Sequence, residues 1–395
     1  MRVPLLDLSA QHRALAEPLR AEIDQILGTQ QFILGPKVEA FEAAICEYTG
    51  ASHAVGVSSG TDALLAILMA LEIGPGDAVV TTAFTFFATA GCIARVGATP
   101  VFVDIDPVSC NVSPGALESY LAEQCHRSAD GRLLDGAGRT VRAIVPVHLY
   151  GLCCERDPIL AAAERYGLIV IEDAAQAIGA EYPLAGGRAQ AGTMGEAGYF
   201  SFYPSKNLGA AGDAGLIVCR DGALAKKLRV CRQHGMEPRY FHHFIGGNFR
   251  LDAIQAAVLN VKLPHLNGWS AGRRRVADVY REEFTRRGLT EHVTLPPEPW
   301  RDAGLTNHHI YHQYIIRTQR RDALREHLTA QGVGSAIYYP LGLHQQKCFA
   351  YLNYSEGDLP ETEQAARETL ALPVFPELAR EEQLFVIETI ERFFF

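Results

Sequence analysis

Short apolar runs recur through the first half of the chain, and segments with helical spacing separate them. The runs cover residues 54–57, 78–82, 99–104, 143–147 and 168–171. The helical segments between strands of this kind are about 10–15 residues long. Strands and helices that alternate in this way form parallel βαβ units, with helices on both faces of the sheet. The pattern predicts an α/β fold with a mostly parallel central sheet between helices.

A break in the second half of the chain predicts two domains. At 395 residues, 48% of them hydrophobic, the chain can build a large core and a second, smaller domain. Pro264 and Gly268 interrupt an apolar helical segment that begins at Leu251. We expect a large domain over residues 1–258 and a small C-terminal α+β domain over residues 259–395.

Charge and cysteine usage narrow the range of partners. A net charge of −9 disfavours nucleic acid and anionic membrane surfaces as partners, so small molecules are expected instead.

No apolar run reaches the roughly 18 residues that cross a bilayer, and the amino terminus lacks a signal-peptide core. Nine irregularly spaced cysteines without a C-x-x-C motif fit a reduced protein. The expected location is the cytoplasm.

Lys206 stands in an unusual setting, between an aromatic strand-like run and a glycine-rich turn. The stretch from Gly198 to Val218 reads G-Y-F-S-F-Y-P-S-K-N-L-G-A-A-G-D-A-G-L-I-V. Burial lowers the pKa of a lysine, and the neutral amine can then attack an aldehyde and form a Schiff base. Two alternatives stay open from these residues alone, a phosphate-binding turn and a buried ion pair.

A second stretch, S-S-G-T-D at residues 58–62, joins an apolar strand to an apolar helix. Free backbone N–H groups, a hydroxyl and the helix dipole meet at such a junction, so it can hold a phosphate without a cation. The alternative is a simple Ser or Thr helix cap that binds nothing.

A third stretch, E-D-A-A-Q at residues 172–176, follows the apolar run 168–171. Ligands of parallel sheets bind at this end of the strands. Asp173 either caps the next segment or pairs with a cationic ring nitrogen, and Gln176 could donate to a ring hydroxyl. The aromatic group at residues 84–87 packs in the core or offers a face to a planar ring.

An amine for an aldehyde, a phosphate cradle and a carboxylate for a pyridinium nitrogen are the three features that bind pyridoxal 5′-phosphate. Their joint presence at strand ends favours the Schiff-base interpretation of Lys206 over its alternatives. The sequence therefore predicts pyridoxal phosphate as cofactor, with pyridoxamine 5′-phosphate formed in the half-reaction.

The same residues carry a resemblance to a family. The chain resembles the nucleotide-sugar aminotransferases of the DegT/DnrJ/EryC1/StrS group, which have the fold type I architecture of aspartate aminotransferase. The resemblance covers nearly the whole length, and E-D-A-A-Q together with S-F-Y-P-S-K is its most specific part. The motifs are P-L-L-D-L at 4–8, I-L-G-P at 33–36, S-G-T-D-A-L at 59–64, G-P-G-D at 74–77, F-V-D-I-D at 102–106, P-V-H-L-Y-G at 146–151, E-D-A-A-Q at 172–176, S-F-Y-P-S-K-N-L-G at 201–209 and G-G-N-F-R-L-D at 246–252.

The resemblance implies a role for individual residues. Lys206 would bind the cofactor aldehyde and shuttle the proton, and Asp173 would meet the pyridinium nitrogen. The other cofactor contacts implied are Gln176 at the ring oxygen, Gly60, Thr61 and Ser201 at the phosphate, Phe86 (or Phe84) stacked on the ring, and Asn248 at the phosphate of the neighbouring subunit. A homodimer with shared active sites follows from the last contact.

Substrate contacts are less well marked. Arg250 belongs to a basic, aromatic segment at 234–250 that could receive a nucleotide diphosphate or glutamate carboxylates, although such residues are mostly solvated or ion-paired. Tyr338 and Tyr339 are further substrate candidates, but I-Y-Y-P at 337–340 departs from the H-Y-P common in the family. We assign no metal site, because the histidines at 308, 309 and 312 have no acidic or cysteine partner at ligand spacing.

The resulting hypothesis is an enzyme that moves an amino group from an amino acid, expected to be L-glutamate, onto a keto carbon of a nucleotide-linked sugar. The motifs at residues 4–8 and 146–151 favour a 3-keto sugar over a 4-keto sugar. One alternative is a cofactor-binding regulator without turnover. The dehydratase branch of the family is a second, but its members carry histidine in place of the Schiff-base lysine, and Lys206 is present here.

Overall fold

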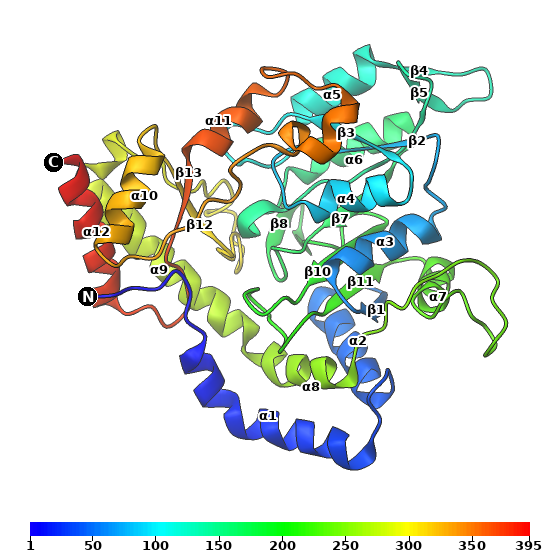
Figure 1. Ribbon diagram of the computed structural model, residues 1–395, viewed down its shortest axis with the longest axis horizontal. Helices are drawn as coiled ribbons and strands as arrows, with labels where there is room; N and C mark the ends of the chain where they lie inside the picture. Colours follow the sequence, from blue (N-terminus) through cyan, green and yellow to red (C-terminus); the bar gives the residue numbers. More distant parts are fainter.

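A nine-stranded sheet forms the centre of the molecule, which the computed structural model describes over residues 1–395 (Figure 1). The main strand order is β1-β11-β10-β7-β6-β2-β3, and the hairpin β4-β5 continues the sheet from β6. The bounds are β1 His53–Val57, β2 Asp77–Thr82, β3 Thr99–Val103, β4 Cys125–Arg127, β5 Leu133–Asp135, β6 Thr140–Ile144, β7 Ile169–Asp173, β10 Ala197–Ser201 and β11 Gly215–Cys219.

Strands β10, β7, β6, β2 and β3 are parallel, whereas β11 runs antiparallel to both β10 and β1. The predicted α/β class with a mostly parallel sheet is therefore confirmed. Two small sheets complete the strands, β8 (Glu181–Leu184) with β9 (Gly187–Gln190) and β12 (Tyr314–Arg317) with β13 (Thr369–Leu372).

Helices cover both faces of the central sheet. The α-helices are α1 Ser9–Thr29, α2 Pro36–Thr49, α3 Gly60–Ala70, α4 Ala88–Arg95, α5 Pro114–Glu123, α6 Arg156–Tyr166, α7 Gly222–Cys231, α8 Ala253–Lys262, α9 Leu266–Arg286, α10 Arg321–Ala330, α11 Pro360–Glu368 and α12 Arg380–Phe394. Short 3-10 helices lie at η1 Leu149–Gly151, η2 Leu263–His265, η3 Leu289–Glu291, η4 Leu343–Gln345 and η5 Lys347–Leu352.

Strand β11 explains why the apolar runs are continuous. Leu216 and Val218 pack in the core cluster formed with α2 and α8, whereas Ile217 and Cys219 pack in the cluster formed with α3 and α7. Alternate side chains of a strand point to opposite faces, so a strand covered on both faces needs apolar residues at every position.

The C-terminal part has a core of its own, built from α9, α10, α12 and the β12-β13 sheet. Val3 belongs to this core and forms a bridge with Val333, so the amino terminus lies on the C-terminal part (Figure 1). The division at residues 258/259 stays a prediction. The N-terminal contact is a pairing across more than 300 residues, which no local pattern signals.

Gly198 illustrates how closely the backbone packs near the centre of the sheet. A Cβ at this position would lie 2.2 Å from the carbonyl oxygen of Gly192 and 2.5 Å from its Cα. A side chain there cannot be accommodated without moving the backbone of the neighbouring loop.

We expect Gly198→Ala to lower the free energy of unfolding by about 2 kcal/mol or more, as overpacking against fixed backbone does. Gly268→Ala in α9 is the matched control, because a Cβ there meets nothing within 4 Å. The control should stabilise the helix by about 0.5–1 kcal/mol. Denaturant unfolding measures both changes, and equal stability of the two variants would contradict the packing argument.

Candidate active site

The carboxyl ends of four parallel strands open onto one cavity of about 590 Å³. Segments that follow β2, β6, β7 and β10 contribute side chains to its wall, together with the start of α3 and parts of the C-terminal segment. The residues that line it include Gly60, Thr61, Thr85, Phe86, Thr89, Tyr150, Asp173, Gln176, Ser201, Lys206, His312, Gln313, Tyr338 and Tyr339.

The start of α3 forms one end of the cavity. Ser59 caps the helix by accepting a hydrogen bond from the Asp62 amide at 3.0 Å. The amides of Gly60 and Thr61, in the first turn, have no carbonyl partner within the helix and can bind an anion. A Cβ on Gly60 would lie 2.8 Å from the Cβ of Ser201, so only glycine allows the two segments to approach this closely. The cap and the anion site therefore coexist at this helix end.

Asp173 ends β7, is 5% exposed and faces the cavity. Its Oδ2 accepts a hydrogen bond from the Thr89 hydroxyl at 2.8 Å, and its Oδ1 accepts one from the Ala175 amide at 3.1 Å. The Thr89 hydroxyl also lies 3.2 Å from that of Thr85. A hydroxyl from α4 thus orients the carboxylate toward the cavity.

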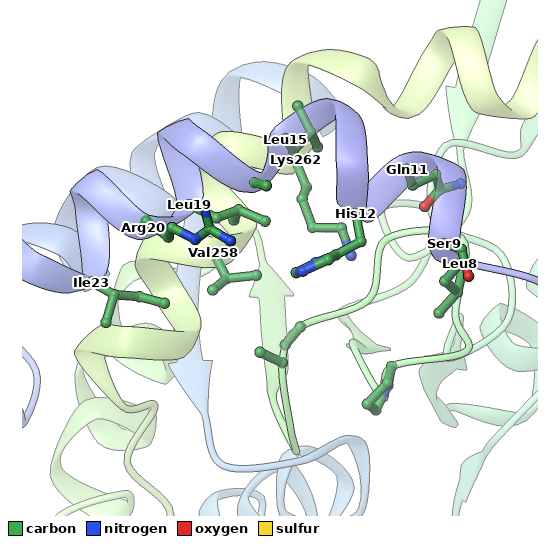
Figure 2. A pocket seen from close by; sticks show the side chains of 14 residues that line it. Leu8, Ser9, Gln11, His12, Leu15, Leu19, Arg20, Ile23, Val258 and Lys262 are labelled. Atoms are coloured by element: carbon green, nitrogen blue, oxygen red, sulfur yellow. The ribbon is translucent and has the colours of Figure 1, made fainter.

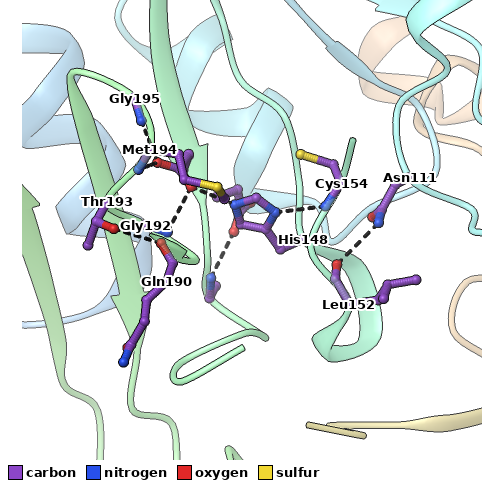
Figure 3. A network of polar contacts seen from close by, with 12 residues as sticks. Asn111, His148, Leu152, Cys154, Gln190, Gly192, Thr193, Met194 and Gly195 are labelled. Carbon is purple, nitrogen blue, oxygen red and sulfur yellow. Dashed lines mark hydrogen bonds and ion pairs between the residues drawn. The ribbon is translucent and has the colours of Figure 1, made fainter. Parts of the chain in front are cut away.

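Glu172, one residue earlier, is also buried but does not line the cavity, and the partners of its carboxylate, His148, Gly192, Met194 and Gly195, are labelled in Figure 3. It accepts hydrogen bonds from His148 Nε2 at 2.8 Å and from the amides of Gly192 at 2.8 Å, Met194 at 2.5 Å and Gly195 at 2.6 Å. The Cys154 amide donates to His148 Nδ1 at 3.1 Å, so this nitrogen is unprotonated and Nε2 carries the proton given to Glu172. The network fixes the end of β7 against two loops.

Gln176 is held by its own amide group. Its Oε1 accepts a hydrogen bond from the Tyr150 amide at 2.8 Å, and its Nε2 donates to the Tyr339 hydroxyl at 3.1 Å. These contacts fix which end of the side chain carries the donor, and one N–H of Nε2 remains for another acceptor in the cavity.

Lys206 projects from the loop that follows β10. The Lys206 amide donates to the Tyr203 carbonyl and the Ala210 amide donates to the Phe202 carbonyl, both at 2.8 Å. Burial lowers the pKa of the Lys206 amine from 10.5 to about 8, and the Asp173 carboxylate opposes this shift. The two side chains predicted to work together do line one cavity.

Helix α8 anchors the Lys206 loop from behind. Gln255 Oε1 accepts from the Ala211 amide at 2.8 Å, and Lys262 Nζ donates to the Gly209 carbonyl at 2.5 Å. Helices α1 and α8 and the loop border a second hollow of about 470 Å³ (Figure 2). Its wall contains Lys262 but not Lys206, so it lies outside the cavity just described.

Nine of the candidate residues meet in the cavity: Gly60, Thr61, Phe86, Asp173, Gln176, Ser201, Lys206, Tyr338 and Tyr339. Of the two phenylalanines considered for stacking, Phe86 lines the wall and is 58% exposed, whereas Phe84 is buried in the core. Asn248 and Arg250 do not line the cavity of their own chain. Asn248 is exposed, and the backbone of Arg250 pairs with Val57.

Sequence reasoning missed Thr85, Thr89, Tyr150 and Gln313, and it considered His312 only as a metal ligand. The three histidines separate in the structure, since His308 faces Glu298 and His309 stacks on Tyr311 while His312 lines the cavity. No group of three or more side chains able to hold a metal ion occurs in residues 1–395. None of the helices has both the length and the apolar character needed to cross a bilayer.

Comparison with known sequences gives a match over almost the whole chain. The profile of the DegT/DnrJ/EryC1/StrS aminotransferase family matches residues 14–391. A pleiotropic regulatory protein of Geobacillus stearothermophilus is 47% identical over 100% of this chain and 99% of its own. A UDP-N-acetyl-3-dehydro-alpha-D-glucosamine 3-aminotransferase of Acidithiobacillus ferrooxidans is 44% identical over 99% of this chain and 97% of its own. A dTDP-3-amino-3,4,6-trideoxy-alpha-D-glucose transaminase of Streptomyces venezuelae is 39% identical over 98% and 95%.

Solved structures agree with this match. DesV from S. venezuelae, in complex with a ketimine intermediate, has a TM-score of 0.88 and 38% identity, over 99% of this chain and 98% of that chain. NtdA from Bacillus subtilis, with bound cofactor PMP, has a TM-score of 0.86 and 29% identity, over 99% and 85%. The similarity therefore extends to the whole fold.

The shifted pKa of Lys206 can be measured on the protein freed of bound small molecules. We expect the acetylation rate of Lys206 to rise with a midpoint at about pH 8, whereas the midpoint of an exposed lysine lies at about pH 10.4.

The same pKa affects stability. Because the folded pKa lies below the unfolded value of 10.5, protonation of this amine opposes folding below about pH 8, and this penalty is lost as the pH rises from about 8 to 10.5.

Asp173→Asn should move the midpoint further down, because the carboxylate that favours the charged amine is lost. Mass spectrometry of the acetylated peptides measures the pH midpoint of Lys206 acetylation in the wild-type protein and in Asp173→Asn. A midpoint near that of an exposed lysine, or an upward shift in Asp173→Asn, would show that burial and Asp173 do not control this amine.

Proposed function

The chain belongs to the DegT/DnrJ/EryC1/StrS aminotransferase family, and from that premise we propose that it uses pyridoxal 5′-phosphate to move an amino group from L-glutamate onto a keto carbon of a nucleotide-linked sugar. The observation that carries the proposal is the convergence of Lys206, Asp173 and the start of α3 on one cavity. These groups come from three segments far apart in sequence, and each matches a different part of the cofactor.

The cavity fits the cofactor in charge and shape. The free amides of Gly60 and Thr61, at the positive end of α3, suit the phosphate, and the absence of a side chain on Gly60 leaves room beside Ser201. Asp173, oriented by Thr89, suits a protonated ring nitrogen. Gln176 has a free N–H for the ring oxygen, and the exposed face of Phe86 suits stacking on the ring.

When bound, pyridoxal phosphate supplies an electron sink for the carbon that carries the amino group. The protein then has to supply a base that can change its protonation state near neutral pH. Lys206 meets this need, because its pKa of about 8 leaves a usable fraction of neutral amine. In one half-reaction its Nζ would take a proton from the amino-acid carbon, and in the other it would give a proton to the sugar carbon. The Asp173 carboxylate stabilises positive charge on the ring nitrogen throughout.

Amination at C-3 is the favoured position. Two relatives, at 44% and 39% identity, are named for amination at C-3 of a nucleotide-linked sugar. The competing substrate is a 4-keto sugar with the same nucleotide attachment.

A regulator without turnover is the second candidate. It is favoured by the relative at 47% identity that is named as a pleiotropic regulatory protein. The Lys206 amine and the Asp173 carboxylate would then bind the cofactor without acting on a substrate. Turnover separates the two candidates.

We further propose a homodimer in which Asn248 reaches the cofactor phosphate of the partner. Asn248 is exposed and lies outside the cavity of its own chain, so a contact with cofactor requires a second copy. The preceding residues Tyr240, Phe241 and Ile245 are 74%, 66% and 89% exposed, which suits a segment covered by another subunit.

The function is tested by supplying L-glutamate with a UDP- or dTDP-linked 3-keto sugar, and separately with the 4-keto isomer. We expect formation of 2-oxoglutarate and an amino sugar with the 3-keto substrate.

Lys206→Ala should abolish turnover and covalent cofactor binding while it still binds pyridoxal phosphate noncovalently, because the phosphate and ring contacts remain. Lys227→Ala, which removes an exposed ion pair with Glu72, is the control and should keep full activity.

Retained turnover in Lys206→Ala would overturn the role of this lysine. Turnover of the 4-keto isomer alone would overturn the position, and no turnover of either sugar by a protein that binds the cofactor would favour the regulator.

The shared site predicts that Asn248→Ala weakens cofactor retention by roughly tenfold, the loss of one hydrogen bond to a charged group. Asn267→Ala, an exposed position in α9 outside the cavity, should leave retention unchanged. Equilibrium dialysis of pyridoxal phosphate measures both, and sedimentation checks that each variant remains a dimer. Unchanged affinity in dimeric Asn248→Ala would count against the contact across the subunits.

A further inference from the structure

His312 lines the cavity that contains Lys206 and Asp173, but the proposed transfer of an amino group assigns it no role. It is 6% exposed, and its Nδ1 lies 3.2 Å from Oδ1 of Asn207, the residue that follows Lys206. Asn207 is 6% exposed and donates from Nδ2 to the Ile310 carbonyl at 2.9 Å. The amide of Asn207 therefore contacts the C-terminal segment at two points.

These contacts fix the protonation of His312. Because Nδ2 of Asn207 is the donor to Ile310, Oδ1 can only accept, and His312 must carry its proton on Nδ1. Nε2 is then the unprotonated nitrogen. The neighbouring Gln313 side chain agrees with this assignment, because its Nε2 is a donor and lies 3.5 Å from His312 Nε2.

The surrounding charges keep His312 neutral. Burial lowers the pKa of His312 well below 6.5, and the positive charges of Lys206, from the cavity, and Arg273, from α9, lower it further. Neither of the two hydrogen-bond partners of its ring, Asn207 and Gln313, is a carboxylate. A protonated His312 would also lose the single acceptor nitrogen facing Gln313.

The segment that carries His312 is itself held firmly. The buried Arg273 guanidinium donates to the carbonyls of Tyr311 at 3.0 Å, His312 at 3.3 Å and Val374 at 3.0 Å. On the other side, the Ile310 amide donates to the Gly151 carbonyl at 3.0 Å. Residues 310–312 therefore form a fixed support against which Asn207 can be locked.

We propose that Asn207 and His312 form a clamp that positions the Lys206 amine, with His312 held as the neutral tautomer protonated at Nδ1. The inference rests on the proposed function of Lys206. His312 is a positioning residue in this account, because it acts through Asn207. The clamp should matter most when Nζ attacks the cofactor aldehyde, a step that forms the Nζ–carbon bond and releases the aldehyde oxygen as water. Displacement of a reacting group by about 1 Å costs up to about 100-fold in rate.

Two substitutions separate the ring nitrogen from the rest of the side chain. His312→Phe removes the donor to Asn207 and keeps an aromatic ring, whereas His312→Asn places an amide nitrogen close to the position of Nδ1. With saturating pyridoxal phosphate added to the full-length protein freed of cofactor, we measure the rate at which the visible absorbance of lysine-bound cofactor appears. We expect a rate at least about 10-fold slower in His312→Phe and within about threefold of wild type in His312→Asn.

Two controls distinguish positioning from general damage. His344→Phe removes another buried histidine, which is paired with Glu363 and does not line the cavity, and it should leave the rate unchanged. Noncovalent affinity for pyridoxal phosphate, compared between Lys206→Ala and Lys206→Ala/His312→Phe, should agree within about twofold, because the clamp acts on the amine and not on the phosphate site. Asn207→Leu should slow capture as much as His312→Phe, and the double variant should be no slower than either.

A wild-type rate in a folded His312→Phe protein would overturn the clamp. Loss of affinity in Lys206→Ala/His312→Phe would overturn it as well, since His312 would then shape the whole pocket. If His312→Phe does not fold, nitrogen-15 NMR of histidine-labelled wild-type protein still decides: a His312 ring protonated at Nε2, or one that titrates near pH 6.5, contradicts the proposal. Wild-type protein that never develops the visible absorbance would instead show that the proposed function of Lys206 is wrong.

Discussion

The cavity around Lys206 depends on two adjacent carboxylates at the end of β7, whose side chains point in opposite directions. Glu172 binds the loops behind the strand, and Asp173 lines the cavity. Glu172 faces the interior and accepts hydrogen bonds from His148 and three backbone amides, so it joins β7 to the loops at 148–154 and 192–195 (Figure 3). Removing one hydrogen-bond partner of a buried carboxylate of this kind costs about 1–3 kcal/mol or more, because the charge is then left less well satisfied inside the protein. Asp173 is free to face the cavity because Glu172 fixes the strand behind it.

Lys206 gains its chemistry from a balance between burial and a neighbouring charge. Burial alone favours the neutral amine, and Asp173 partly restores the charged form, so the pKa comes to about 8. A base with this pKa can both accept and release a proton near neutral pH. The loop around it has little freedom, since α8 fixes its far side through Gln255 and Lys262 while Asn207 contacts the C-terminal segment. Position and protonation of the amine are thus set by different neighbours.

The sequence predicts the fold and the centre of the site well, because both depend on local patterns. Continuous apolar runs indicate a sheet covered on both faces, and Lys206, Asp173 and Gly60 each stand in a motif whose chemistry is visible in a few residues. The supporting contacts are a different matter. Thr89 meets Asp173 across 84 positions and His312 meets Asn207 across 105, and neither pairing leaves a local signal. The choice between Phe84 and Phe86 likewise needed the structure, since both are aromatic residues in the same turn and only one lines the cavity.

The central claim is that a single buried amine, Lys206, captures the cofactor opposite Asp173. Its most direct test is reduction of the cofactor-saturated protein with borohydride, followed by peptide mapping with mass spectrometry. We expect one stable pyridoxyl group per chain, on Lys206. A group on any other lysine, or none at saturating cofactor, would contradict it.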